Sequence, residues 1–260
     1  MRIRTLCSRT ICLAIITAMI LVSVSASHAS ASPTELTRSR RPAFAPPESQ
    51  IVTKDIREDS KTRNYSIDAH FPHLAGGAEA RGGKFNVEVD ALVGKRIAAF
   101  KSAAETDSAS GKVRRSTITI NYHVTFSNGR LLSVSFPVEY YLTRHGYETM
   151  CLTYDLQKEA EVTLADVFKP EADYLRVMAE FCLPRLSGHL GNKSDPNLVK
   201  QGASAKADNY KVWNLTSTGI EITFDPGRVA PAELGVQSVT VPFSTLKPLV
   251  ATGSPVYALT

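Results

Sequence analysis

Two runs of alternating apolar and polar residues, joined by an Asn-Gly pair, constrain the fold of this chain more than any other feature. The first run covers residues 116–125 and the second covers residues 131–142. Asn128 and Gly129 lie between them, and this pair readily adopts the positive backbone angles of a tight hairpin turn. We therefore predict a long antiparallel hairpin, which a third strand over residues 149–156 would extend into a meander.

Apolar residues spaced three and four apart predict two main helices that cover the sheet. The clearer helix spans residues 85–100, and its apolar positions are Phe85, Val89, Leu92, Val93, Ile97 and Phe100. The second begins near Glu171, and Pro184 should kink or end it. A polar connection is expected over residues 188–208. The fold class is therefore α+β, a mostly antiparallel sheet with two main helices packed on it.

Residues 1–31 have the pattern of a signal peptide for export. Three arginines precede an apolar run over residues 11–24, and a small-residue segment offers a cleavage site between Ala29 and Ala31. The run is shorter than the roughly 20 residues that a membrane-spanning helix needs, although an uncleaved anchor is the alternative. Residues 32–50 are polar and proline-rich and are expected to form a disordered leader. We expect a periplasmic or secreted protein with no integral membrane segment after cleavage.

The charge of the chain gives little reason to expect a nucleic-acid partner. The formal net charge is +5, and it falls to +2 when the signal peptide takes away three arginines and no acid. Nucleic-acid binding normally calls for a concentrated basic face. Residues 51–260 are enough for one sizeable domain or two small ones packed closely together.

Two cysteines remain after the signal peptide, Cys151 on the third predicted strand and Cys182 on the second helix. In an exported protein such a pair often forms a disulfide. A bridge here would stabilise the fold by roughly 3 to 4 kcal/mol on the chain-entropy model. Reduced thiols in the core are the main alternative, and a catalytic thiol or an intermolecular bridge are further ones.

Separated segments in the second half of the chain together resemble a known family of exported domains. Two predicted strands, over residues 220–224 and 236–241, flank a loop rich in proline and glycine. The segments that carry the resemblance are Phe224–Pro226, Val229–Pro231, Gly235, Val239–Ser244, Tyr154–Leu156 and Val162–Phe168. They resemble the domain of unknown function found in the lysozyme-sensing anti-sigma factor RsiV and ahead of the catalytic domain of the peptidoglycan deacetylase PdaC. A secreted mycobacterial antigen shares this fold.

The resemblance implies both a domain organisation and a function. Residues 51–108 would form the small α+β companion subdomain that usually comes first, and residues 109–260 would form the RsiV-like C-terminal domain. By comparison with these relatives, we expect neither the sigma-binding segment nor the deacetylase domain in this chain. We therefore expect an exported, non-catalytic module of the cell envelope that binds or senses a protein or cell-wall glycan, lysozyme or peptidoglycan by resemblance. No cofactor is expected.

Two predicted loops supply the candidate binding residues. These are His145, Tyr147 and Glu148 in the first loop and Asp225 and Arg228 in the second. The first loop departs from the family, which commonly has a Gly-Gly-Ala-His-type turn there. One alternative is a glycan-acting envelope hydrolase that uses Asp225, Glu148 or His145 as acid or base. A structural surface protein without a small ligand is the other.

Two motifs with a catalytic or metal-binding pattern have plainer interpretations. Residues 223–227 are similar to the first motif of polysaccharide deacetylases, but Pro226 stands where those enzymes have a second aspartate. His70 and His73, with Asp68 nearby, are too few for a zinc site, which usually needs three or four ligands. We expect a strand end at the first motif, surface histidines at the second, and no metal.

Overall fold

A computed structural model describes residues 51–75, 82–109 and 114–260 of the chain. The predicted signal peptide, residues 1–31, and the predicted leader, residues 32–50, lie outside the described residues. Among the helices of the described part, none is both long and apolar enough to cross a membrane.

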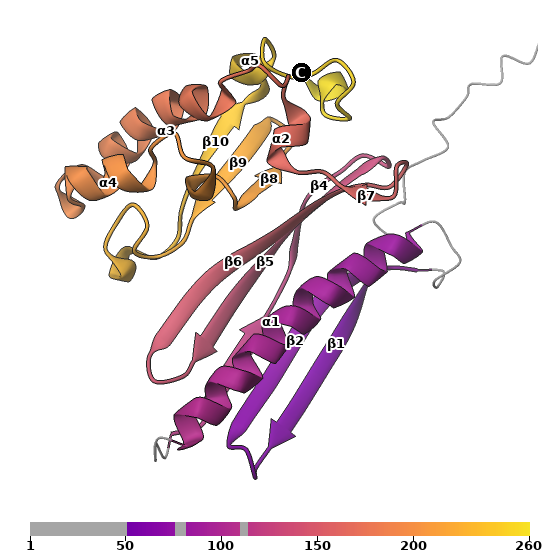
Figure 1. The fold of residues 1–260 in the computed structure, drawn as a ribbon, viewed down its shortest axis with the longest axis vertical. Coiled ribbons are helices and arrows are strands. Elements are labelled where there is room, and N and C mark those ends of the chain that lie inside the picture. Colours follow the sequence, from indigo (N-terminus) through magenta and orange to yellow (C-terminus); the bar gives the residue numbers. More distant parts are fainter. Residues whose placement is uncertain (1–50, 76–81, 110–113) are drawn as a thin grey trace, which may run out of the picture. The chain divides into compact units, whose positions relative to one another are not determined.

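A seven-stranded sheet forms the first half of the fold (Figure 1). Its strands are β1 (Ile51–Ser60), β2 (Tyr65–Leu74), β3 (Ser116–Ile120), β4 (His123–Ser127), β5 (Leu131–Tyr141), β6 (His145–Asp155) and β7 (Ala160–Glu161). The order is β1-β2-β3-β5-β6-β7, with β4 also paired to β5. Every pairing is antiparallel except that of β2 with β3, which the helix α1 (Gly83–Ala109) connects. The predicted α+β fold class is confirmed.

The predicted Asn-Gly hairpin is present between β4 and β5. The side chain of Asn128 accepts hydrogen bonds from the amides of Arg130 and Leu131, and Gly129 has a φ of 84°. The first run of the hairpin is split at residues 121–122, so that β3 and β4 pair with different parts of β5. The third strand was predicted too short, because the polar segment before Thr149 is already paired with β5.

The helix α1 lies along β2 (Figure 1) and closes the first hydrophobic core. The predicted apolar stripe is confirmed, since all of its positions except the partly buried Leu92 are buried. The ring of Phe85 packs edge-on against that of Tyr154, and the ring of Phe100 packs edge-on against that of Tyr65. We call this cluster, which the helix shares with β2, β3, β5 and β6, the N-terminal core.

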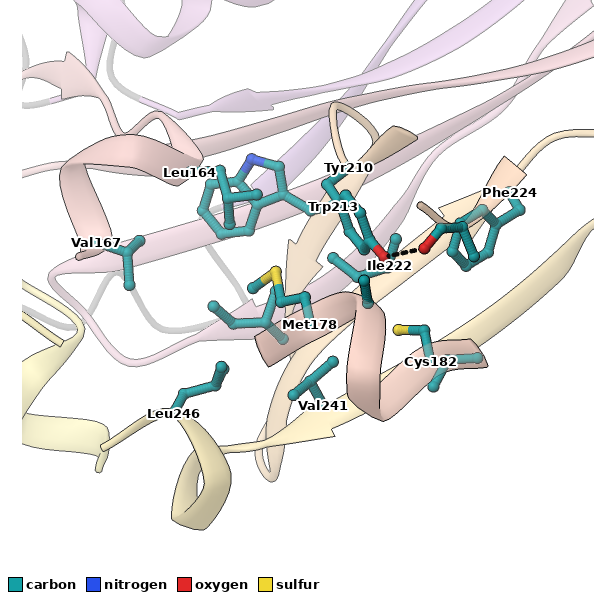
Figure 2. Close-up of a cluster of buried hydrophobic side chains, with 14 of the residues drawn as sticks. Leu164, Val167, Met178, Cys182, Tyr210, Trp213, Ile222, Phe224, Val241 and Leu246 are labelled. Atoms are coloured by element: carbon teal, nitrogen blue, oxygen red, sulfur yellow. Dashed lines mark hydrogen bonds between the residues drawn. The ribbon is translucent and has the colours of Figure 1, made fainter. Parts of the chain in front are cut away.

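A three-stranded antiparallel sheet and several helices form the second half. The strands are β8 (Trp213–Leu215), β9 (Gly219–Phe224) and β10 (Gln237–Pro242), in the order β10-β9-β8. The helices are α2 (Leu164–Val167), α3 (Tyr174–Leu190), α4 (Pro196–Gly202) and α5 (Phe243–Leu246). Figure 2 shows the C-terminal core, in which Met178 and Cys182 of α3 gather with Trp213, Ile222 and Val241 of the sheet.

The second helix differs from its prediction at both ends. It begins at Tyr174, where the side chain of Asp173 accepts a hydrogen bond from the amide of Arg176. It does not end at Pro184, which is exposed. Proline frees the carbonyl four residues earlier, and Glu180 at that position is itself exposed, so that water can satisfy the carbonyl. The connection predicted over residues 188–208 is correspondingly shorter and contains α4.

The strand β5 contributes to both cores through opposite faces. Leu131 belongs to the C-terminal core, whereas Leu132 and Val134 belong to the N-terminal core. The hydroxyl of Ser133, on the same face as Leu131, accepts hydrogen bonds from the Leu215 amide and the Asn214 side chain of β8 at 3.0 and 3.1 Å. The division of the chain at residues 108 and 109 stays a prediction, and β3 shares the N-terminal core with the residues before that point.

Candidate functional site

The tip of the β5–β6 hairpin and the loop after β9 meet at a hollow of about 580 Å³, which we call the groove. Such a volume is typical of small-ligand sites. The groove is lined by Tyr140, His145, Gly146 and Tyr147 of the hairpin and by Pro226, Ala232, Gly235 and Val236 of the loop. The two predicted loop regions therefore lie together, although the first of them belongs mostly to β6.

The loop side of the groove is shaped by glycine and proline. Gly227 and Gly235 have φ values of 84° and 69°, which side chains disfavour. Pro231 precedes a short 3₁₀ turn over Ala232–Leu234. As a result, the apolar side chains of Leu234 and Val236 are 38% and 37% exposed.

Asp225 connects this loop to β6. One carboxylate oxygen accepts a hydrogen bond from the backbone amide of Thr149 at 3.0 Å. Burial raises the pKa of Asp225, and the charge of Glu148 adds to the increase, although hydrogen bonds from Thr149 oppose it. The interpretation of residues 223–227 as a strand end agrees with this geometry, because β9 ends at Phe224 and Asp225 holds a backbone amide.

Two tyrosines give the hairpin side of the groove its aromatic character. Burial raises the pKa of Tyr147, and the carboxylate of Asp225 adds to the effect. Tyr140 lies opposite Gly146 in the ladder, and a side chain at Gly146 would overlap its ring. The guanidinium of Arg96 on α1 lies 4.8 Å from the centre of the Tyr140 ring and also pairs with Glu148.

The five predicted binding residues are therefore divided among different environments. His145 and Tyr147 line the groove, and the His145 ring lies 2.7 Å from the exposed carboxylate of Glu139. Asp225 and Arg228 line a second hollow of about 290 Å³ that shares Pro226 with the groove. Glu148 pairs with Arg96 instead.

Arg228 has a structural contact within that second hollow. Its guanidinium donates to the backbone carbonyl of Asp208 at 2.9 Å and to the carboxylate of the same residue at 3.2 Å. Both side chains are well exposed, so the ion pair contributes little stability.

Tyr140, Ala232 and Val236 were missed as groove residues by the sequence interpretation. Tyr140 could have been found only from the pairing register of β5 with β6, which places it opposite Gly146. Val236 was predicted to begin a strand, but β10 begins at Gln237, and no periodicity marks Ala232 in the irregular loop before it.

The cysteines are free thiols in the structure, so the predicted Cys151–Cys182 disulfide is not formed. Cys151 on β6 accepts a hydrogen bond from the Trp213 amide at 3.4 Å, whereas Cys182 lies in the C-terminal core. Burial raises the pKa of Cys151 to about 11 and that of Cys182 to about 12. Thiols with such pKa values are poor nucleophiles at neutral pH.

The candidate histidines of β2 form ion-pair contacts rather than a cluster of ligands. His70 lies 2.7 Å from a carboxylate oxygen of Asp55, and His73 lies 2.9 Å from one of Asp90. Within the part of the chain that the structure describes, no three His, Cys, Asp or Glu side chains are placed to hold a metal ion.

Comparison with known proteins identifies the same family that the sequence segments resemble. Residues 165–244 match the family described as "Protein of unknown function (DUF3298)". Over 194 residues the chain is 24% identical to the peptidoglycan-N-acetylmuramic acid deacetylase PdaC of Bacillus subtilis (strain 168). The match covers 74% of this chain and 40% of PdaC, so the chain spans about two fifths of the length of this curated relative.

Two solved structures of DUF3298 proteins have the same fold. One, from Bacteroides fragilis, gives a TM-score of 0.54 at 14% identity, and the match covers 80% of this chain and 96% of that one. The other, from Pseudomonas aeruginosa, gives a TM-score of 0.59 at 11% identity, with 78% and 95% covered. The resemblance to the family of the PdaC domain is therefore confirmed, and so is the fold.

Proposed function

We propose that this chain is an exported, non-catalytic domain that binds the bacterial cell wall, and that the groove holds the ligand. The observation that carries the proposal is the meeting of the β6 tip with the Pro226–Val236 loop in one hollow. The likeness to PdaC, whose name records peptidoglycan as its substrate, supports the choice of ligand. A periplasmic or extracellular location follows from this proposal.

The contacts of the acidic groups support binding rather than catalysis. Hydrolysis of a glycosidic bond usually needs two carboxyl groups that flank the bond. Asp225 uses one oxygen to hold the Thr149 amide, and Glu148 is paired with Arg96. His145, the third candidate acid or base, is exposed and contacts Glu139.

Co-sedimentation with purified peptidoglycan sacculi tests the proposal. The wild-type chain without residues 1–31 should sediment with the sacculi. Val236→Glu places a charge in the groove and should weaken binding at least about tenfold, because a bound ligand would cover this charge without supplying a partner. Val87→Glu is the matched control, since Val87 is an exposed valine of α1 that does not line the groove.

The outcome distinguishes the proposal from its alternatives. Equal binding by both variants, or no binding by the wild type, would contradict it. Soluble lysozyme added as a competitor tests the partner that the resemblance also implies. Release of cleaved muropeptides, lost in Asp225→Asn, would instead establish the envelope hydrolase.

A further inference from the structure

We propose that the groove recognises the peptide part of peptidoglycan, by pairing a short extended peptide with the open edge of β6 at Tyr147. This inference depends on the proposed function for the identity of the wall polymer. It adds which part of that polymer is bound and through which atoms.

The outer edge of β6 has no strand partner next to the groove. On its inner side β6 pairs with β5 along its whole length. On its outer side β7 pairs only with Tyr154 and Asp155. The described strands therefore leave the segment from His145 to Leu152 without a strand partner on its outer edge.

Three hydrogen bonds establish which backbone groups point outward from β6. The amide of Thr149 donates to Asp225, and the carbonyl of Thr153 accepts from the amide of Val162. On β5, the carbonyl of Pro137 accepts from the Asn121 amide on the far side from β6. Because Pro137 is opposite Thr149, this ladder position has no bond between the two strands.

Tyr147 is two residues from Thr149, so its amide and carbonyl also point away from β5. The register between β5 and β6 is unbroken across this segment, so no bulge changes the direction in which these backbone groups point. Within residues 51–75, 82–109 and 114–260, no group hydrogen-bonds to either of these two backbone atoms. The residue that carries them, Tyr147, lines the groove.

Such an edge is chemically complementary to an extended peptide. An added strand supplies an amide and a carbonyl at matching spacing, and main-chain hydrogen bonds of this kind give affinity in many peptide-binding domains. The carboxylate of Asp225 already accepts from the Thr149 amide. Toward the hairpin tip, Tyr147 is therefore the next residue whose outward amide and carbonyl are available to a ligand. A sugar chain does not present paired donors and acceptors at the spacing of a strand.

Small residues form part of the groove wall next to β6. Gly146 has no side chain, and the opposite wall presents Ala232 and Pro226. Without bulky side chains at these positions, the backbone of an added strand can approach β6 closely. The stem peptides that crosslink the glycan are the peptide part of peptidoglycan, and we assign them as the occupant.

Isothermal titration with three ligands tests the inference. The ligands are a disaccharide muropeptide with its stem, peptide-free glycan released by an amidase, and the stem peptide alone. The muropeptide and the stem peptide should bind with similar affinity. The peptide-free glycan should bind at least about tenfold more weakly, the loss expected for about one net hydrogen bond.

Two substitutions at one position isolate the backbone amide. Tyr147→Ala removes the side chain and keeps the amide, whereas Tyr147→Pro removes both. Proline is tolerated on a strand edge where the amide faces outward. Tyr147→Pro should therefore bind the stem peptide about tenfold more weakly than Tyr147→Ala, with unchanged β-sheet circular dichroism.

A change in the ligand avoids any effect on folding. A stem peptide that is N-methylated at each amide in turn should lose affinity for the wild-type protein at one position, the one that pairs with the Tyr147 carbonyl. Equal binding of peptide-free glycan and muropeptide would overturn the inference and leave the proposed function standing. Failure of all three ligands would overturn both.

Discussion

Gly146 lies opposite Tyr140 in the β5–β6 ladder, and the tyrosine ring occupies the space that a side chain at residue 146 would need. Arg96 covers the same ring and pairs with Glu148. The position of the ring, and with it one wall of the groove, therefore depends on the lack of a side chain at a single residue.

Gly146→Ala should displace the Tyr140 ring and destabilise the protein by about 1–3 kcal/mol, the usual cost of overpacking. It should also weaken sedimentation with sacculi. The control is Gly94→Ala, in the middle of α1, where a new methyl group meets no atom within 4 Å. That change should stabilise the protein by about 0.5–1 kcal/mol. Urea unfolding measures both, and a neutral result for Gly146→Ala would contradict the packing described.

Asp225→Asn tests the partly buried carboxylate of Asp225. The raised pKa means that folded Asp225 holds a proton that the unfolded chain releases, so stability falls as pH rises from the ordinary aspartate value of 3.8 through the raised pKa. Asparagine has no such titration, and its amide oxygen can still accept from Thr149. The variant should be at least as stable as the wild type at pH 7, with a flatter pH dependence of unfolding. A clear loss of stability at pH 7 would show that the charge itself is needed.

At the scale of elements, the hydroxyl of Ser133 accepts two of the hydrogen bonds that attach β8 to the larger sheet, and the Cys151 thiol accepts another from the Trp213 amide. Ser133 is fully buried and accepts from two groups of β8, the Leu215 amide and the Asn214 side chain, and it also lies 2.8 Å from the hydroxyl of Thr153. Buried donors that lose their acceptor cannot be satisfied by water, so this contact is costly to remove.

Ser133→Ala should therefore destabilise the protein by about 1–3 kcal/mol. Ser135→Ala is the matched control on the same face of β5, because the Ser135 hydroxyl bonds to no group within the described residues. Thermal unfolding of the two variants gives the comparison. Similar melting temperatures would mean that the Ser133 hydroxyl is not needed to hold β8.

The edge strand β1 is held to β2 in part by His70, whose ring nitrogens lie 2.7 Å from Asp55 and 3.2 Å from Asp68. The hydrogen bond to Asp55 raises the pKa of His70, and Arg57 is the cation nearest to these two carboxylates. A raised histidine pKa gives stability that is present below pH 6.5 and lost as pH rises through the folded-state value.

Stability should therefore decrease between pH 5.5 and pH 8 by a few tenths of a kcal/mol, up to about 1, for this partly exposed pair. His70→Gln should flatten that decrease, and hydrogen exchange of β1 amides should show the same trend. His189→Gln, at the exposed end of α3, serves as the control. An unchanged pH profile in His70→Gln would remove His70 as its cause.

At the scale of the whole molecule, the two cores are joined through opposite faces of β5, with Leu131 on one and Leu132 on the other. The sequence was sufficient for the α1 stripe and the Asn-Gly turn, because periodicity and turn chemistry are local. It was not sufficient for α3 beyond Pro184, since the exposure of Glu180 decides whether proline is tolerated there. The groove required tertiary information, because Tyr147 and Val236 are far apart in sequence and only the packing of the loop against β6 brings them together.

A bridge between Cys151 and Cys182 would have connected β6 to α3, but both thiols are free in the structure. The mature protein should therefore show the intact mass of two free thiols, and reductant should leave its melting temperature unchanged. Alkylation in the native state at pH 8 should be slow for both, given pKa values of about 11 and 12. A mass lower by two hydrogens, restored by reductant, would establish the bridge.

The parallel pairing of β2 with β3 has a consequence for the order of folding. The β1–β2 hairpin and the β4–β5–β6 meander are each built from neighbouring segments, which close quickly. The junction between β2 and β3 must wait for the whole α1 crossover, because the loop entropy of that long connection is lost before any contact compensates it. The rate-limiting step of folding should therefore be the docking of the preformed β1–β2 hairpin and β4–β5–β6 meander around α1. Core substitutions in this helix should then slow folding more than they speed unfolding.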